Sequence, residues 1–395
     1  WLLQRVTDNI FSSRFIELKK GSAKGEDEER EIVSQEMQKL PCDVIYEILI
    51  RASFSTLLRQ SRWVCKDWQK LITCDPKFQQ SHSKRAVSSG VFFIHKFVSF
   101  VRTNSEHEEH YDSVQEVQSP SLDFLPAAKS ITIAGSSLHG SLLCCVTKSS
   151  STPIPSFYMC KPASQEWRKI PNPKTRFEYS RIGIEVKQSS CSILRYKVLR
   201  LSDSKTGYGY HCQLFNSESW AWKTLSFVQF RRHGTFLKGG DGIWVNGGLH
   251  WLTNYDEVFV FDTDQEKWTT FKVSPEMKNI SRSDRVVLVS CDGKLGIIYH
   301  TNEWMEIWIL ENNSTTNPSW KRKYRNDTRS LHQNVEHLCA HHMWSNNTVM
   351  MMGRYEIVYF NCEKNTYTRT KLPATTEDIF SLGEPYAFQP QFCYL

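Results

Sequence analysis

The hydrophobic pattern of the chain changes once, near Lys84. From Leu40 to Phe78 the apolar residues recur every three or four positions, a spacing that places them on one face of a helix. They fall into three short segments, and the last of these ends at Asp75-Pro76. The pattern predicts a small three-helix unit over residues 36–80. A unit of this size cannot bury all its apolar side chains, so some of them need a partner.

Residues 1–35 show only a weak apolar face, followed by a charged stretch from Gly21 to Glu31. Charged sequence that contains Gly and Ser is typical of linkers. We therefore interpret this region as an N-terminal extension and a charged linker.

Residues 84–395 have the pattern of short strands, with apolar or alternating runs separated by turn residues. Four predicted hairpins share one register and place Asn, Asp, Gly or His where a tight turn needs a positive φ. They are the segments 138–143, 245–250, 291–296 and 345–350. Each hairpin is followed by another strand, a polar turn and an aromatic residue that opens a last strand. The region therefore consists of repeats with four strands each.

The aromatic residues that open the last strand set the period of these repeats. They are Trp167, Trp222 (or its neighbour Trp220), Trp268, Trp320 and Tyr367. Successive aromatic residues lie 46 to 55 positions apart, near the period of about 50 residues of kelch-type blades. Four strands per repeat predict an all-β, propeller-like domain of about six blades, because radial closure removes long exposed edges. We expect residues 84–130 and 374–395 to complete a sixth unit or to close the ring.

Composition narrows the classes of function. Of the 395 residues 40% are hydrophobic, which excludes global disorder, and the net charge of +7 is too small and too dispersed for a nucleic-acid-binding stripe. The 12 cysteines include no C-x-x-C pair, which argues against a disulfide framework or a thiolate metal cage and favours the cytoplasm or the nucleus. No apolar run approaches the ~18 residues that a membrane helix needs, so we expect no membrane partner.

Candidate metal and phosphate sites are few. Residues of metal-ligating type cluster at His337, Cys339, His341 and His342. On a strand, alternate residues would line one face instead of converging on a metal, so we expect packing there. The run Gly239–Gly242 lacks the Lys-Ser or Lys-Thr and the helix of a phosphate loop, which indicates an interblade turn. Met350–Met352 indicate a buried strand. We find no hydrolase motif, and predict no catalytic residue, no metal and no cofactor.

The helical unit resembles the F-box. The matching residues are Leu40-Pro41-x-Asp43-Val44-Ile45-x-Glu47-Ile48-Leu49-x-Arg51, Ser55-Thr56-Leu57-Leu58-Arg59, Val64-Cys65-Lys66-x-Trp68-x-x-Leu71-Ile72 and Pro76-x-Phe78. The sequence departs from the pattern at Ala52-Ser53 and at Gln60. The rest of the chain resembles the F-box-associated, kelch-related domain of plant F-box proteins. It carries the F-[DN]-x(4,5)-W signature at Phe215-Asn216 and Phe261-Asp262, and an N-G-G-L-H-W hairpin at Asn246–Trp251.

This resemblance implies a non-catalytic, substrate-recognition subunit of an SCF-type ubiquitin ligase. The F-box would dock a Skp-type adaptor and, through it, a cullin, and the propeller would bind the protein to be ubiquitinated. The implied adaptor-binding residues are Leu40, Pro41, Ile45, Ile48, Leu49, Leu57, Leu58, Val64, Cys65 and Trp68. We expect Trp68 to be mostly internal and Cys65 to lie near the interface. Two alternatives stay open: a glycan- or peptide-binding propeller outside a ligase, and a propeller enzyme with metal or paired carboxylates at the ring centre.

Strand order predicts which face of the propeller binds substrate. In a four-stranded blade the second-to-third loops and the interblade loops share one face, and the other turns, such as Asp264–Lys267, lie on the opposite face. Four residues in second-to-third loops are of the types that most often anchor interfaces. They are Tyr255, Trp304, Arg354 and Tyr355. We predict that these residues line the substrate-binding face, with packing on a neighbouring blade as the alternative for Trp304.

Overall fold

The computed structural model of the protein forms two compact units, divided between Val87 and Ser88. It describes residues 41–52, 54–85, 90–93, 96–99, 121–126, 131–137, 141–147, 155–174, 180–187, 194–204, 209–273, 285–312, 318–334, 337–371 and 385–388.

The first unit is helical. Its elements are α3 (Cys42–Arg51), α4 (Phe54–Arg59), the 3-10 turn η1 (Ser61–Trp63), α5 (Lys66–Cys74) and α6 (Pro76–Arg85). The prediction of three helices is wrong by one, because Asp75-Pro76 ends α5 and also begins α6. The Asp75 carboxylate accepts the backbone N–H groups of Lys77 and Phe78 at 2.8 and 3.0 Å, as an N-cap does. The Phe78 ring of α6 is fully buried and meets Tyr46 edge-to-face at 5.5 Å.

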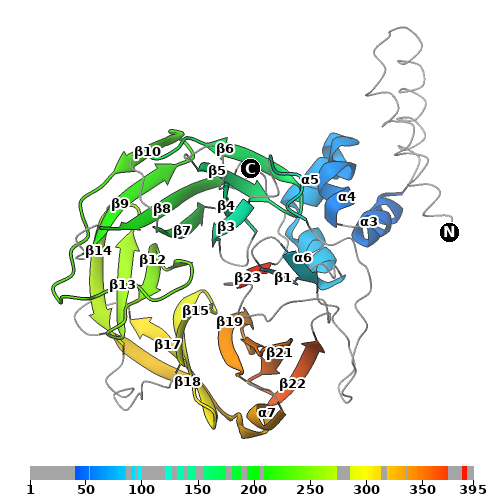
Figure 1. The fold of residues 1–395 in the computed structure, drawn as a ribbon. Coiled ribbons are helices and arrows are strands. Elements are labelled where there is room, and N and C mark those ends of the chain that lie inside the picture. The colour runs from blue at the N-terminus through cyan, green and yellow to red at the C-terminus, as the bar shows by residue number, and fades with distance from the viewer. Residues whose placement is uncertain are drawn as a thin grey trace. The chain divides into compact units, whose positions relative to one another are not determined.

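The second unit is built from five four-stranded antiparallel sheets, here called blades 1 to 5 (Figure 1). Blade 1 comprises β3 (Ile131–Ser136), β4 (Leu143–Thr147), β5 (Ser156–Lys161) and β6 (Glu166–Ile170). Blade 2 comprises β7 (Ser180–Lys187), β8 (Arg195–Asp203), β9 (Tyr210–Asn216) and β10 (Ala221–Thr224). Blade 3 comprises β11 (Ile243–Val245), β12 (Gly248–Leu252), β13 (Glu257–Asp262) and β14 (Lys267–Lys272).

Blades 4 and 5 repeat the same strand order. Blade 4 comprises β15 (Arg285–Cys291), β16 (Lys294–His300), β17 (Trp304–Asn312) and β18 (Ser319–Asp327). A short helix, α7 (Arg329–Asn334), leads to blade 5, which comprises β19 (Cys339–Ser345), β20 (Thr348–Met352), β21 (Glu356–Asn361) and β22 (Thr366–Lys371). The first strands of successive blades contact one another from β3 through β7, β11 and β15 to β19, which is the arrangement of a β-propeller.

A three-stranded sheet, here called the closing sheet, joins the two ends of the propeller sequence. It comprises β1 (Gly90–Phe93), β2 (Lys96–Ser99) and β23 (Pro385–Phe388). The strand β1 pairs antiparallel with both β2 and β23, and Gly90 lies opposite Phe388. The Tyr386 hydroxyl donates to the Ile133 carbonyl of blade 1 at 3.1 Å. The structure therefore shows five four-stranded blades, where the sequence predicted about six. The described parts of the leftover segments form this closing sheet, which has three strands instead of four.

The turn between the third and fourth strands explains the F-[DN] signature. The side-chain oxygens of Asn216, Asp262 and Asn361 accept the backbone N–H two residues later at 2.8 to 3.1 Å. The last turn residue has a positive φ in four blades, at Gln165, Trp220, Glu266 and Asn365. This turn sets the register, in which Trp222, Trp268 and Tyr367 lie opposite Phe215, Phe261 and Phe360.

The predicted hairpin turns are confirmed at two of the four places. Asn246 and Gly247 have φ values of 50° and 79°, and Asp292 and Gly293 have 53° and 69°. The turn at Asn346–Asn347 lacks a positive φ and follows a register shift before Ser345, so that prediction is wrong in its geometry. The turn in segment 138–143 lies partly outside the described residues. Met350, Met351 and Met352 form a buried strand, as predicted.

His250 in the hairpin of blade 3 makes stability depend on pH. The side chain is 4% exposed, and its Nδ1 lies 3.2 Å from the Ile243 carbonyl oxygen. Burial lowers the pKa of His250 to about 4, although backbone hydrogen bonds to Ile243 and Gly248 act in the opposite direction. The unfolded chain, with a His pKa of about 6.5, therefore binds the proton more tightly than the folded protein. The neutral His250 side chain therefore stabilises the folded protein fully only above about pH 6.5. This contribution to stability is lost as the pH falls from about 6.5 towards 4.

We expect this residue alone to lower the free energy of unfolding by about 2 kcal/mol between pH 7 and pH 5. Urea unfolding at both pH values measures the difference, and the control is His250→Gln, which does not titrate. An equal pH dependence in the two proteins would contradict the prediction.

Candidate functional site

An apolar stripe runs along α3. Pro41 and Val44 are exposed, Val44 by 42%, and Ile45 and Ile48 are half-buried. Their spacing of three, four and seven positions places them on one face of the helix. Of the other candidates, Val64 is half-buried and Cys65 is exposed, and the Cys65 thiol accepts the Trp68 N–H at 3.5 Å. The stripe offers apolar surface to a partner.

The remaining adaptor-binding candidates lie deeper in the helical unit. Leu49, Leu57, Leu58 and Trp68 are buried, so they hold the helices in place and offer little surface of their own. Leu40 lies outside the described residues. Sequence reasoning missed Trp63, which is 61% exposed in η1 with the Arg62 guanidinium 4.7 Å from its ring centroid. The one feature of the sequence that could have indicated this exposed residue is its position between two predicted helices.

Three of the four substrate-binding candidates, Tyr255, Arg354 and Tyr355, lie in the second-to-third loops of blades 3 and 5, where strand order had placed them. The fourth, Trp304, is the first residue of β17 in blade 4, directly after such a loop. The Tyr255 hydroxyl donates to the His233 carbonyl at 3.3 Å. Trp304 is half-buried against Tyr299 of its own blade, with ring centroids 4.8 Å apart. Tyr355 is 56% exposed.

Each of these aromatic rings has an arginine beside it. The guanidinium carbon of Arg232 lies 3.6 Å from the Tyr255 ring centroid, and those of Arg325 and Arg354 lie 5.4 Å from Trp304 and Tyr355. A cation–π pair leaves the N–H edge of a guanidinium able to bind an anion. Arg325 already uses its Nε in an ion pair with Glu306 at 3.5 Å. Three consecutive blades thus repeat an Arg–aromatic pair on one face.

The interblade loop between β10 and β11, residues 225–242, is the part of this face that sequence reasoning missed. It exposes Arg231, Arg232 and Phe236 beside the loop that holds Tyr255. The available signal was the Arg-Arg-His run between two repeats. The glycine run at its end, Gly239–Gly242, is an interblade turn, as predicted.

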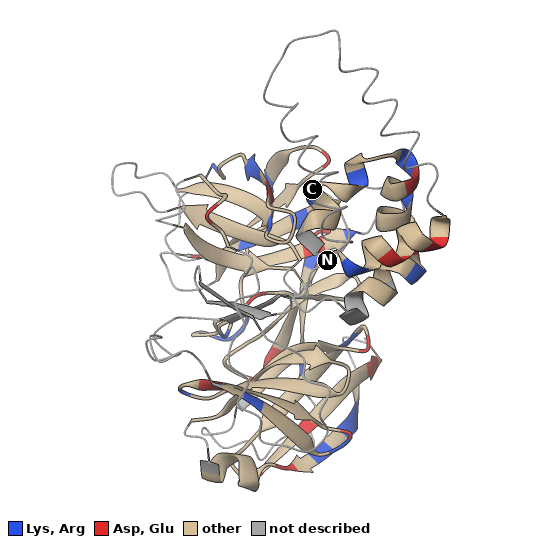
Figure 2. Cartoon of the chain, turned by 90° about the vertical axis from the view of Figure 1, so that its right-hand side faces the viewer, with Lys and Arg blue, Asp and Glu red and all other residues tan. Residues whose placement is uncertain are grey.

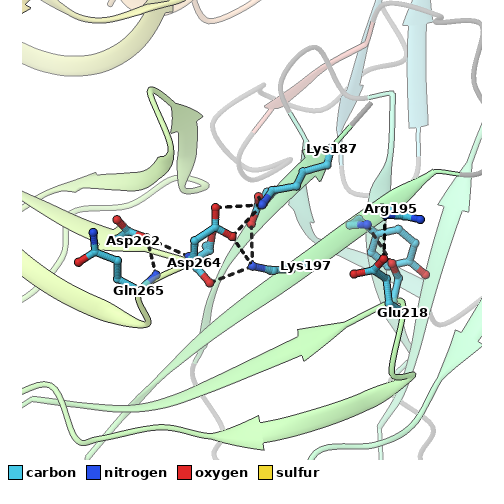
Figure 3. A network of polar contacts seen from close by, with 11 residues as sticks. Lys187, Arg195, Lys197, Glu218, Asp262, Asp264 and Gln265 are labelled. Atoms are coloured by element: carbon cyan, nitrogen blue, oxygen red, sulfur yellow. Dashed lines mark hydrogen bonds and ion pairs between the residues drawn. The ribbon is translucent and has the colours of Figure 1, made fainter. Parts of the chain in front are cut away.

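The opposite face carries ion pairs that tie blade 2 to blade 3 (Figure 3). The Asp264 carboxylate accepts from Lys187 at 2.7 Å and from Lys197 at 2.8 Å. Hydrogen bonds from these two ammonium groups lower the pKa of Asp264 to about 2. Both of the lysines come from blade 2, whereas Asp264 lies in the third-to-fourth turn of blade 3. The charges here are paired with one another and serve to hold adjacent blades together.

The charge distribution and the metal-ligating residues indicate no further candidate site among the described residues. Figure 2 shows basic and acidic positions interspersed over the strands and turns. In the part of the chain that the structure describes, no three His, Cys, Asp or Glu side chains gather as a metal site would require. None of the helices among the described residues has the length and apolar character that a membrane crossing needs.

These features define a five-bladed β-propeller protein with a helical unit before the propeller. A family model described as the F-box associated beta propeller domain matches residues 91–385. The chain is 26% identical over 288 residues to F-box protein At5g49610 of Arabidopsis thaliana, covering 70% of this chain and 76% of that protein. It is 31% identical over 168 residues to F-box protein At5g41720 of the same plant, covering 42% and 87%. F-box protein DOR, also from Arabidopsis thaliana, is 23% identical over 386 residues, covering 90% and 92%.

The chain therefore belongs to the plant F-box proteins with an F-box-associated β-propeller domain. The resemblance deduced from the sequence is confirmed at this level.

Proposed function

We propose that this protein is the non-catalytic, substrate-recognition subunit of an SCF-type ubiquitin ligase. The helical unit docks a Skp-type adaptor and through it a cullin, and the propeller binds the protein to be ubiquitinated. The observation that carries the proposal is the apolar stripe of α3 in a chain whose remaining length is an F-box-associated propeller. Within the proposal, the closing sheet counts as the sixth blade of a kelch-type ring, and the protein acts in the cytoplasm, the nucleus or both.

The proposal is tested by co-expression of the full chain with a plant Skp-type adaptor and a cullin. We expect the three proteins to co-purify, and we expect a chain that lacks residues 36–80 to lose the adaptor while the propeller still folds. The division of the chain after Val87 supports that design. A folded full chain that fails to bind any adaptor would overturn the ligase assignment. It would favour a glycan- or peptide-binding propeller acting alone, or a propeller enzyme if the purified chain turned over a substrate.

The same proposal assigns the substrate to the face of the second-to-third loops. Once a substrate is identified, by capture under proteasome inhibition, Trp304→Ala and Arg354→Ala should each weaken its binding by about 1 to 3 kcal/mol. The melting temperature should change little for Arg354→Ala, because that side chain lies in a loop. It should fall more for Trp304→Ala, because Trp304 is half-buried against Tyr299 at the start of β17. The control is Glu266→Ala in the opposite face, which should not weaken binding. Equal loss from the control, or no loss from the Trp304 and Arg354 variants, would place the substrate site elsewhere.

A further inference from the structure

The 225–242 loop is held firmly although it is long and lies between blades. Its Val228 exchanges two backbone hydrogen bonds of 2.9 Å with Tyr210 of blade 2. Its Leu237 is fully buried, and the Leu237 N–H donates to the Tyr210 hydroxyl at 2.9 Å. Asn254 of blade 3 fixes Phe236 by accepting its N–H at 2.9 Å and by donating its own N–H to the Phe236 carbonyl at 3.0 Å. The loop is therefore anchored to two blades.

Between these anchors the loop presents Arg231, Arg232 and Phe236. Together with Tyr255 of the β12–β13 loop, these residues are here called the Arg-aromatic surface. Phe236 is 54% exposed even though its backbone is fixed, so its ring offers apolar area. The Tyr255 ring lies under the Arg232 guanidinium and holds it in one orientation. A ligand that binds such a preorganised surface loses less conformational entropy than one that must order a mobile loop.

Within the part of the chain that the structure describes, no acidic side chain neutralises the two arginines. Among the described residues, Arg231 and Arg232 form no ion pair and donate no side-chain hydrogen bond, whereas the neighbouring Lys238 is paired with Asp256 at 2.8 Å. Asp256 is thus already satisfied, and the arginines keep an uncompensated positive charge beside an exposed apolar ring. A complementary ligand supplies carboxylates together with a bulky apolar side chain.

We propose that the Arg-aromatic surface binds an acidic segment of the protein substrate, with carboxylates on Arg231 and Arg232 and an apolar side chain on Phe236. This inference rests on the proposed function, because it names the chemistry of the substrate. In blade 4 the corresponding Arg325 is already ion-paired with Glu306, with its Nε 3.5 Å from a carboxylate oxygen. The binding surface is therefore confined to the 225–242 loop and Tyr255.

The test uses the full chain and three labelled peptides of equal length. One alternates Glu with Leu, one replaces every Glu by Gln, and one replaces every Leu by Ser. Fluorescence anisotropy measures binding at about 50 mM and about 500 mM salt. We expect the Glu–Leu peptide to bind at least about tenfold more tightly than either of the others at low salt, and to lose most of that advantage at high salt.

Variants separate the two parts of the surface. Arg231→Glu and Arg232→Glu should each weaken binding of the Glu–Leu peptide about tenfold and make that binding less dependent on salt. Phe236→Ala should weaken it at both salt concentrations and leave the dependence on salt unchanged. The matched charge control is Lys267→Glu at the opposite face, which should leave binding unchanged. Lys267 is exposed and has no ion-pair partner among the described residues.

The proposal is overturned if the Gln–Leu peptide binds equally well, if Lys267→Glu weakens binding as much as the arginine variants, or if a single-stranded RNA binds in place of the peptide. Adaptor binding by the same variants keeps the two proposals distinguishable. The Arg232→Glu protein should bind the adaptor normally. Loss of peptide binding with retained adaptor binding would therefore be an effect on the Arg-aromatic surface alone. Failure of the wild-type chain to bind any adaptor, with peptide binding intact, would overturn only the ligase assignment.

Discussion

Gly242→Ala should lower the free energy of unfolding by about 3 kcal/mol, a large effect for one methyl group. A Cβ atom at Gly242 would lie 2.2 Å from Cζ2 of Trp251, and one at Gly183 would lie 2.6 Å from Cη2 of the same indole. The two glycines form a parallel bridge at which the first strand of blade 2 meets the start of blade 3. Trp251 is 2% exposed and packs against Phe259, so it cannot move aside without disturbing the core.

Urea unfolding of three variants separates the clash from backbone strain. Gly247 has a positive φ of 79°, but nothing lies within 4 Å of a Cβ atom added there. Gly247→Ala should therefore lower the free energy of unfolding by only about 1 kcal/mol. Trp251→Phe removes the ring atoms that a new methyl group would meet. In that background Gly242→Ala should cost far less than in the wild-type protein, and additive effects of the two substitutions would argue against the contact.

The parts of the fold that depend on short-range signals could be predicted from the sequence. The third-to-fourth turns follow from an Asn or Asp side chain that caps a backbone N–H two residues away, so Asp262 and Asn361 reveal their turns locally. The positions of the second-to-third loops could be predicted once the strand order of the blades was known. In the helical unit, by contrast, Asp75-Pro76 serves two helices at once, and a local rule that ends one helix misses the next.

The parts that the sequence could not predict depend on contacts between distant residues. The 225–242 loop is fixed by Tyr210 and Asn254, and the sequence of the loop does not predict those partners. Likewise, Leu49 and Ile48 are neighbours with the same hydrophobicity, yet one is buried and the other half-exposed, because the packing of the other helices decides which side of α3 is covered. Helical spacing identifies an apolar face but not its partner.

Ile48→Asp should abolish adaptor binding under the proposed function. Ile48 lies in the α3 stripe with Val44 and Ile45, and a carboxylate there would be buried without a partner when the adaptor covers the stripe. Burial of an unpaired charge in an apolar contact costs several kcal/mol, so affinity should fall by a factor of about 100 or more. Calorimetric titration of the purified full chain with a Skp-type adaptor measures the change.

Because Ile48 is half-buried, Ile48→Asp also carries some risk of destabilising the helical unit. Val44→Asp avoids this risk, since Val44 is 42% exposed in the free protein and its replacement leaves the core of the unit intact. It should weaken adaptor binding for the same physical reason, with unchanged circular dichroism. The control is Lys70→Asp, at an exposed position of α5, which should retain affinity. If both α3 variants fold and bind the adaptor as tightly as the wild-type chain, the stripe is not the docking surface.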